Sequence, residues 1–259
     1  MELGIRGKTA LVTASSSGIG KQCALMLAGE GARVVMCARG ADRLESAAAE
    51  VAAVGGADQV LAVPTDLSKS DQIAALCRQA RDRFGGADIL IFIGGSPKRV
   101  GFEALTEADL QDAFEITVMA AFRLLKDVLP GMKERKWGRV VTVQSRAVRE
   151  PIQDLVTSVA TRPGVAGLFK YLANEAAPYG VNINTIVPGR IDTDRFQQGV
   201  NREQEGAGQY LAGKISGIPV GRLGYAHEIA SAACFLASER ASYITGAALQ
   251  VDGGVIRAI

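Results

Sequence analysis

A glycine-rich segment near the N-terminus has the composition of a phosphate-binding turn. Residues 13–20 read TASSSGIG, directly after an apolar run and directly before a stretch of helical period. Small residues let the backbone turn tightly and approach a pyrophosphate, and the N–H groups at a helix N-terminus favour its negative charge. This strand–turn–helix context is the one that the motif requires, although a tight turn without a ligand has the same composition. The candidate phosphate-binding residues are Thr13, Ser15, Ser16, Ser17, Gly18 and Ile19.

The end of the second predicted strand indicates which dinucleotide the turn would bind. A site for NAD usually has a carboxylate there, which accepts hydrogen bonds from the ribose 2′-hydroxyl. This sequence has Ala38 followed by Arg39. A guanidinium suits a 2′-phosphate, so we expect NADP, with Arg39 as a solvated surface charge being the alternative.

A second polar group follows the fifth predicted strand. Ser145 ends that strand and can donate a hydrogen bond to a carbonyl or an oxyanion. Arg146 and Arg149 come next, and Lys98 and Arg99 follow the fourth strand. Ligands of open parallel sheets bind outside the carboxyl ends of the strands, so these cations fit either an anionic substrate or solvated loops.

The elements that must position these residues alternate between short apolar runs and longer helical segments, which is typical of βαβ units. The predicted strands are Thr9–Thr13, Arg33–Cys37, Gln59–Val63, Asp88–Ile93, Arg139–Val143, Asn182–Val187 and Ala248–Val251. The predicted helices include Ile19–Ala28, Asp42–Val54, Asp71–Phe84 and Asp112–Met132. We therefore predict an α/β protein: one Rossmann-fold domain over residues 1–259, with a doubly wound seven-stranded parallel sheet and helices on both faces.

Two segments interrupt the regular alternation. Residues 194–217 are polar and interrupted by glycine. A long segment of this kind fits either a substrate lid or an ordinary surface loop. Pro163 and Gly164 fall inside a predicted long helix and could kink it beside the site.

Composition excludes several classes of protein. The 29 basic and 27 acidic residues give no strong charge for nucleic acid or a membrane surface, and no apolar run is long enough to span a bilayer. The four cysteines are scattered without a metal-binding spacing, so we expect buried reduced thiols and no metal. The single histidine, His227, is expected at the surface without a catalytic role. These features predict a soluble cytoplasmic protein.

Several motifs together resemble the short-chain dehydrogenase/reductase family, in particular its 3-oxoacyl-(acyl carrier protein) reductase-like members. TASSSGIG is similar to the family's TGxxxGxG, with Ala14 in place of the first glycine, and GRLG at 221–224 and VDGG at 251–254 match C-terminal signatures. The resemblance covers essentially the whole chain. It implies further cofactor contacts, to adenine, to the ribose and to the nicotinamide carboxamide, from Asp66, Leu67, Gly94, Gly95, Arg162, Pro188, Gly189, Ile191 and Thr193.

The resemblance fails at the catalytic residues. The family uses Asn, Ser, Tyr and Lys, with the tyrosine thirteen residues after the serine and the lysine four residues later. Ser145 fits the serine, but Ser158 and Arg162 stand at the other two positions, and Thr117 stands at the asparagine. A serine hydroxyl is less acidic and shorter than a phenol, and arginine does not act as a proton source, so neither simply replaces the family residue. The sequence thus resembles a divergent branch with Ser-xxx-Arg, whose catalytic candidates are Ser145, Ser158 and Arg162.

Three functions fit this pattern. The first is an NADP(H)-dependent oxidoreductase for a carbonyl/alcohol pair with an atypical site, acting on a small and anionic substrate. The others are a non-catalytic NADP-binding subunit or sensor, and a non-redox isomerase or lyase on the same scaffold. The resemblance also implies a homodimer or homotetramer with two-fold symmetry, packed through the helix at 155–178 and the residues from 252 onward.

Overall fold

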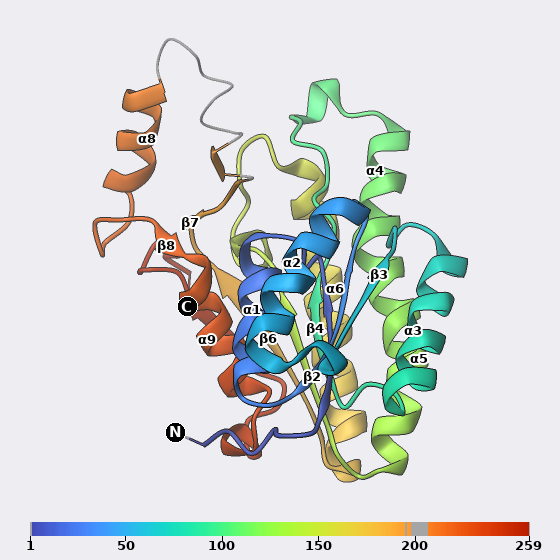
Figure 1. The fold of residues 1–259 in the computed structure, drawn as a ribbon. Helices are drawn as coiled ribbons and strands as arrows, with labels where there is room; N and C mark the ends of the chain where they lie inside the picture. Colours follow the sequence, from blue (N-terminus) through green and yellow to red (C-terminus); the bar gives the residue numbers. More distant parts are fainter. Residues whose placement is uncertain (1, 195, 198–206, 259) are drawn as a thin grey trace.

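In the computed structural model, which describes residues 2–194, 196, 197 and 207–258, a seven-stranded parallel sheet forms the centre of the molecule (Figure 1). The strand order is β3-β2-β1-β4-β5-β6-β9, so the direction of winding reverses between β1 and β4. This confirms the predicted doubly wound sheet. The strands are β1 (Thr9–Thr13), β2 (Arg33–Ala38), β3 (Val60–Pro64), β4 (Ile89–Ile93), β5 (Gly138–Val143), β6 (Val181–Pro188) and β9 (Ala248–Val251).

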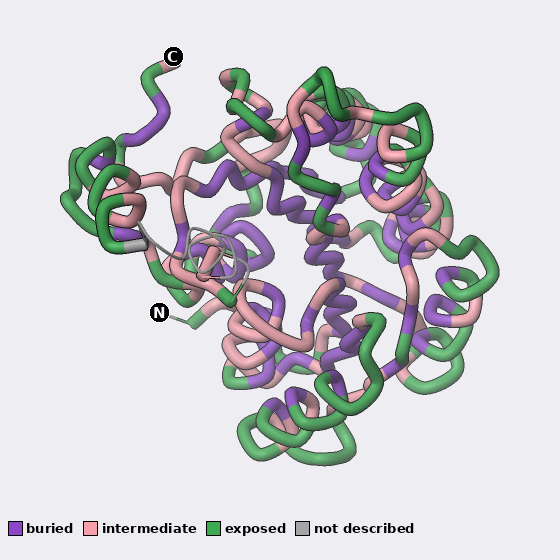
Figure 2. The backbone as a smooth tube through the Cα atoms, turned by 90° about the horizontal axis from the view of Figure 1, so that it is seen from above, coloured by how far each residue is buried: buried purple, intermediate pink, exposed green. Residues whose placement is uncertain are grey.

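Successive residues of each strand point to opposite faces of the sheet, and both faces are covered. Val12 and Met36 belong to the core on one face, whereas Leu11 and Val35 belong to the core on the other. The tube in Figure 2 shows the same arrangement, with buried strands at the centre and exposed helix surfaces around them. Burial on both faces explains why the strands are continuous apolar runs without alternation.

The helices pack in two layers. On one face lie α1 (Gly18–Gly29), α2 (Ala41–Gly55) and α9 (Ala226–Leu236), and on the other lie α3 (Ser70–Phe84), α5 (Ala120–Glu134) and α6 (Val156–Ala176). Two smaller helices, α4 (Glu107–Phe114) and α8 (Ala207–Ser216), lie above the carboxyl ends of the strands (Figure 1). The short strands β7 (Ile191–Asp192) and β8 (Gly224–Tyr225) pair with each other there.

The predicted helix Asp112–Met132 is wrong in its extent. The helical segment begins at Glu107, because the Thr106 hydroxyl accepts from the Asp109 N–H while the Asp109 carboxylate accepts from the Thr106 N–H. A π turn over Glu115–Met119 then separates α4 from α5. Such turns occur frequently at functional sites, and hydrophobic periodicity does not distinguish them from an α-helix.

Other boundaries differ by a residue or two. The third strand starts at Val60 because Ala57–Gln59 forms a 3₁₀ turn. Helix α6 continues through Pro163 to Ala176, so this proline does not end the helix. Of the predicted lid at 194–217, residues 195 and 198–206 lie outside the described residues, and most of the remainder forms α8.

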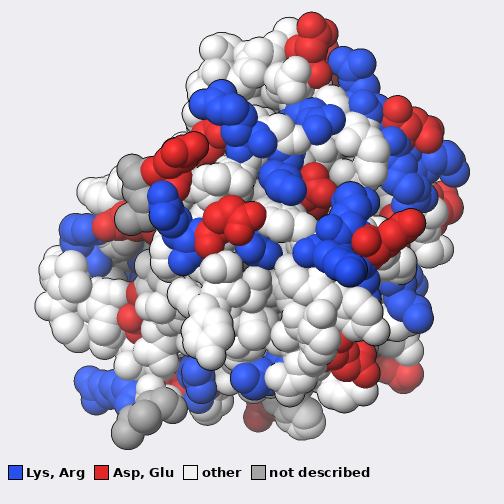
Figure 3. All heavy atoms as spheres, turned by 90° about the horizontal axis from the view of Figure 1, so that it is seen from below, with Lys and Arg blue, Asp and Glu red and all other residues white. Residues whose placement is uncertain are grey.

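As predicted, Cys23, Cys37, Cys77 and Cys234 are buried free thiols and His227 lies at the surface. Among the described helices, none combines the length and apolar character needed to cross a bilayer. Across the part of the chain that the structure describes, no group of three potential ligands is placed to hold a metal ion. On the face seen from below in Figure 3, Lys and Arg are interspersed with Asp and Glu.

Candidate active site

The turn between β1 and α1 has the backbone geometry of a phosphate cradle. Ala14 and Gly18 both take left-handed conformations, with φ of 51° and 53°. A Cβ on Gly20 would lie 2.3 Å from the carbonyl oxygen of Ala14, so only glycine fits there. The tight turn requires left-handed backbone conformations and a position without a side chain, and the small residues of this segment meet both requirements.

Two of the predicted turn residues support the turn rather than line it. The Thr13 hydroxyl donates to the carbonyl of Ile93 (2.9 Å) and accepts from its N–H (2.7 Å). The Ser15 hydroxyl accepts from the N–H of Cys37 (2.9 Å). Both side chains are fully buried. They connect the turn to β4 and β2, which leaves Ser16, Ser17, Gly18 and Ile19 nearer to a ligand.

A cavity of about 660 Å³ runs from this turn along the carboxyl ends of β1 to β4. We call it the cofactor cavity. Its lining contains Ser16, Ser17, Arg39, Asp66, Leu67, Gly94 and Gly95 together with Arg43, Thr65 and Ile116. The structure thus brings together candidates from four separate segments of the chain.

Charge in the cofactor cavity is set by Arg39 and Asp66. Partial burial of Asp66 raises its pKa, but hydrogen bonds from Ser68 and the charges of Arg39 and Lys69 outweigh this, so the pKa of Asp66 lies below its usual value. Asp66 is therefore ionised at neutral pH and accepts from the N–H of Ser68 at 2.9 Å. Arg39 is exposed at the mouth of the cavity, where a phosphate can reach it.

A second cavity of about 300 Å³ adjoins the first, and Ile93, Gly94 and Ser96 line both. We call it the reaction cavity. It collects eight further predicted residues, which are Ile19, Ser145, Ser158, Arg162, Pro188, Gly189, Ile191 and Thr193, whereas Thr13, Ser15 and Gly18 line neither cavity. The predicted catalytic and nicotinamide-binding residues therefore share one cavity, and it is continuous with the predicted phosphate site.

The three catalytic candidates occupy the floor and wall of the reaction cavity. Ser145 follows β5, and its hydroxyl accepts from the N–H of Ala147 at 3.2 Å. Ser158 lies on α6 and is 5% exposed. Arg162, one helical turn later, donates to the Gln144 side-chain oxygen (3.3 Å) and to the Gly95 carbonyl (3.2 Å). Arg162 thus joins α6 to the ends of β4 and β5.

Thr117 lies in the π turn beside these residues. Its hydroxyl donates to the Ala113 carbonyl at 2.5 Å, and its side chain is buried. The neighbouring carbonyl of Ile116 accepts from the N–H of Gly95 at 3.0 Å. The π turn therefore packs against the loop after β4, while the Thr117 hydroxyl is bonded within its own helix.

The predicted cations divide into two groups. Arg99 and Arg146 line the reaction cavity, whereas Lys98 pairs with Asp109 (2.9 Å) and Arg149 is exposed outside the lining. Tyr210, an alternative proton donor on sequence grounds, also lines the reaction cavity. Three further lining residues were not predicted from the sequence: Gln144, Arg190 and Lys214. Arg190 stands between two residues of the recognised 188–193 segment, and that spacing was the available signal.

Comparison with known proteins identifies the family to which the chain belongs. A family model described as enoyl-(acyl carrier protein) reductase matches residues 13–256. A 3-oxoacyl-(acyl-carrier-protein) reductase of Vibrio cholerae is 36% identical over 98% of this chain and 99% of its own. The chain belongs to the short-chain dehydrogenase/reductase family. It is an oxidoreductase of that family by sequence as well as by fold.

Solved structures of other short-chain dehydrogenase/reductases superpose closely. L-Sorbose reductase from Gluconobacter frateurii, crystallised with NADPH and L-sorbose, has a TM-score of 0.95 and 33% identity, with full coverage of both chains. YwfH, an NADPH-dependent reductase of bacilysin biosynthesis, has a TM-score of 0.91 and 31% identity over 97% of this chain and 99% of its own. The substrates in these titles differ, so membership in the family specifies the fold more narrowly than the substrate.

Proposed function

We propose that this protein is an NADP(H)-dependent oxidoreductase that interconverts the carbonyl and alcohol forms of a small molecule. The observation that carries the proposal is the pair of adjoining cavities, which extends from Arg39 to Ser145 and Ser158. The similar reductases crystallised or described with NADPH support the choice of cofactor.

The residues present fit an NADP molecule laid along both cavities. The turn that only Gly20 permits would hold the pyrophosphate at the N-terminus of α1, and Arg39 would pair with the 2′-phosphate. Arg162 would bond the nicotinamide ribose, and the segment 188–193 would hold the carboxamide. When bound, this cofactor supplies or accepts the hydride.

The active site we propose is atypical in its proton chemistry. Ser158 and Arg162 stand where the resemblance expects tyrosine and lysine, and a positioned general acid is worth about 10²–10⁴-fold in rate. Ser145 would donate a hydrogen bond to the substrate oxygen, and a water held by Ser145 and Ser158 would supply the proton. Tyr210 is a further hydroxyl in the cavity lining, so Tyr210→Phe tests whether a phenol replaces that water.

The substrate we propose is small and carries negative charge, as the basic lining of the reaction cavity favours. For assembly we propose a cytoplasmic homodimer or homotetramer packed through α6, whose Tyr171 is 62% exposed, and through the residues from 252 onward. A mass near the 27.1 kDa of one chain in light scattering at micromolar concentration would contradict this assembly.

Hydride exchange with a panel of ketones and oxo acids tests the reaction. We expect NADPH to bind and to be oxidised slowly by simple ketones, and faster by a substrate that fits the cavity. NADPH binding without oxidation by any member of the panel would favour a non-catalytic subunit or sensor. Failure to bind NADPH in calorimetry would overturn the proposal.

A further inference from the structure

The reaction cavity is lined by charges of one sign. Its basic lining residues are Arg99, Arg146, Arg162, Arg190 and Lys214, and no aspartate or glutamate is among its lining residues in the described ranges. Basic side chains gathered around a small volume repel each other, and the repulsion is relieved by a bound anion.

Arg190 is a partly buried cation of the reaction cavity. It connects β6 to β7, it is half-buried, and it donates to the Lys214 carbonyl in the last turn of α8. Burial and the charge of Arg146 both lower the pKa of the Arg190 guanidinium. Two guanidinium groups are thus held close together at the carboxyl edge of the sheet.

Arg146 lines the same cavity from a different segment of the chain. It follows Ser145, and its partner among the described acidic residues is Glu150, at 3.1 Å and one helical turn later. Glu150 and Tyr210 are the groups that offset the positive charge around Arg190. The single carboxylate of Glu150 does not balance the two guanidinium groups of Arg146 and Arg190, so the cavity lining keeps an excess of positive charge.

The cofactor has other positions for its own phosphates. The pyrophosphate turn and Arg39 lie along the cofactor cavity, whereas Arg146 and Arg190 line the reaction cavity and are absent from the lining of the cofactor cavity. The same cavity holds Ser145, which would face the reacting carbonyl. The excess charge therefore lies on the substrate's side of the site.

We propose that Arg146 and Arg190 form a carboxylate-binding subsite, and that the substrate class is a small oxo acid with its hydroxy acid. Guanidinium groups bind carboxylates through paired hydrogen bonds, which also orient the ligand. A cavity of about 300 Å³ suits a molecule of this size. For the reaction this inference rests on the proposed function, but the binding of the anion does not.

The test measures binding without turnover. Calorimetry of the protein saturated with NADP⁺, which has no hydride to give to a ketone, uses pyruvate, acetoacetate and 4-oxopentanoate as probes, with methyl acetoacetate as the neutral match. We expect at least one acid to bind ten-fold or more tightly than the ester. Arg190→Gln and Arg146→Gln should each remove most of that difference, while Arg149→Gln, which changes a neighbouring exposed arginine outside the lining, should preserve it.

Equal affinity of acids and ester would overturn the subsite, as would an equal loss in Arg149→Gln. Acid binding to the protein alone that disappears when NADP⁺ is bound would assign these cations to the cofactor and also overturn it. A normal binding pattern without any hydride transfer from NADPH would instead overturn the proposed reaction and leave the subsite intact.

Discussion

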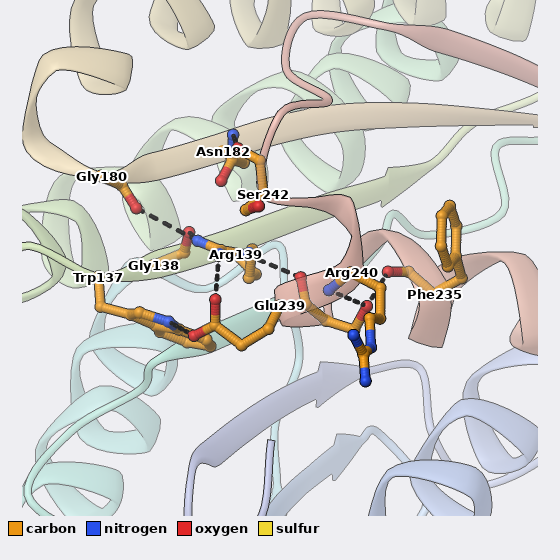
Figure 4. A network of polar contacts seen from close by, with 10 residues as sticks. Trp137, Gly138, Arg139, Gly180, Asn182, Phe235, Glu239, Arg240 and Ser242 are labelled. Atoms are coloured by element: carbon orange, nitrogen blue, oxygen red, sulfur yellow. Dashed lines mark hydrogen bonds and ion pairs between the residues drawn. The ribbon is translucent and has the colours of Figure 1, made fainter. Parts of the chain in front are cut away.

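Two arginines, the buried Arg139 and the half-buried Arg190, have different surroundings. Arg139 lies at the amino ends of the strands, which we call the amino edge, and Arg190 lies at their carboxyl ends, the carboxyl edge. At the amino edge, Arg139 is 3% exposed and donates to the carbonyls of Ser238, Gly138 and Gly180 at 2.9–3.2 Å (Figure 4). It also pairs with Glu239 at 3.3 Å. At the carboxyl edge, Arg190 donates to one carbonyl and has a second arginine as its neighbour.

The difference separates a structural cation from one directed at a ligand. Burial lowers the pKa of Arg139, and the charge of Glu239 opposes that shift, so protein groups alone compensate this guanidinium. Its ring contact with Trp137, 4.6 Å from the centroid, completes its surroundings. Arg190, by contrast, has the positive charge of Arg146 near it. We therefore expect changes at the amino edge to alter stability and changes at the carboxyl edge to alter binding and rate.

The largest effect should come from restoring a proton donor at the carboxyl edge. The triple change Ser158→Tyr, Arg162→Lys and Thr117→Asn should raise reduction of simple ketones and 3-oxoacyl esters by up to about 10²–10⁴-fold, the range for a positioned acid. Steady-state kinetics with NADPH would measure it. Ser145→Ala in this background should remove most of the gain, and vigorous reduction by the unaltered protein would show the site to be misjudged.

At the amino edge, Arg139→Met should destabilise the fold by about 2–4 kcal/mol, because three carbonyls lose their donor and two of them, those of Gly138 and Ser238, belong to buried residues. Arg190→Met should cost less than about 1 kcal/mol, since it also removes a repulsion between like charges. Urea unfolding of both variants measures the free energies. A comparable loss of unfolding free energy in the two variants would contradict the distinction between a structural arginine and a ligand-binding one.

Cofactor preference gives the next effect. NADPH should bind at least about ten-fold more tightly than NADH, a difference of about 1.4 kcal/mol, because Arg39 suits a 2′-phosphate. Arg39→Asp should reverse the preference, as the new carboxylate would repel that phosphate and accept from a 2′-hydroxyl. Equal affinities for both cofactors in calorimetry would refute the assignment.

The smallest effect concerns the core between the two edges. Burial raises the pKa of Cys37 and of Cys234 to about 12, so both remain neutral thiols at pH 8. A thiol-directed reagent should leave these cysteines unmodified in the folded protein and modify them after unfolding in urea. Rapid modification at pH 8 without unfolding would indicate local opening of the sheet.

The sequence predicted most of the fold because buried parallel strands have continuous apolar runs and the glycine turn has a strict context. It also predicted which residues share the carboxyl edge, since strand ends in a parallel sheet meet there. It did not predict the π turn, where Thr117 lies, because a single turn of five residues is too short to establish a hydrophobic period of its own. It missed Arg190 and Lys214, because their approach depends on how α8 packs, and polar side chains carry no periodic signal of that contact.

The hydroxyl of Thr13 bridges β1 to β4 at the point where the winding of the sheet reverses. The backbones of β1 and β4 are already paired as far as Val12 and Ile91, and this bond continues the connection to the strand ends, where the crevice for a dinucleotide begins. Binding then costs less free energy for ordering the protein, and the affinity for the dinucleotide is correspondingly higher. Thr13→Val, which keeps the shape and removes the bridge, would leave the strands paired but loosen their ends, so an incoming dinucleotide would have to order them.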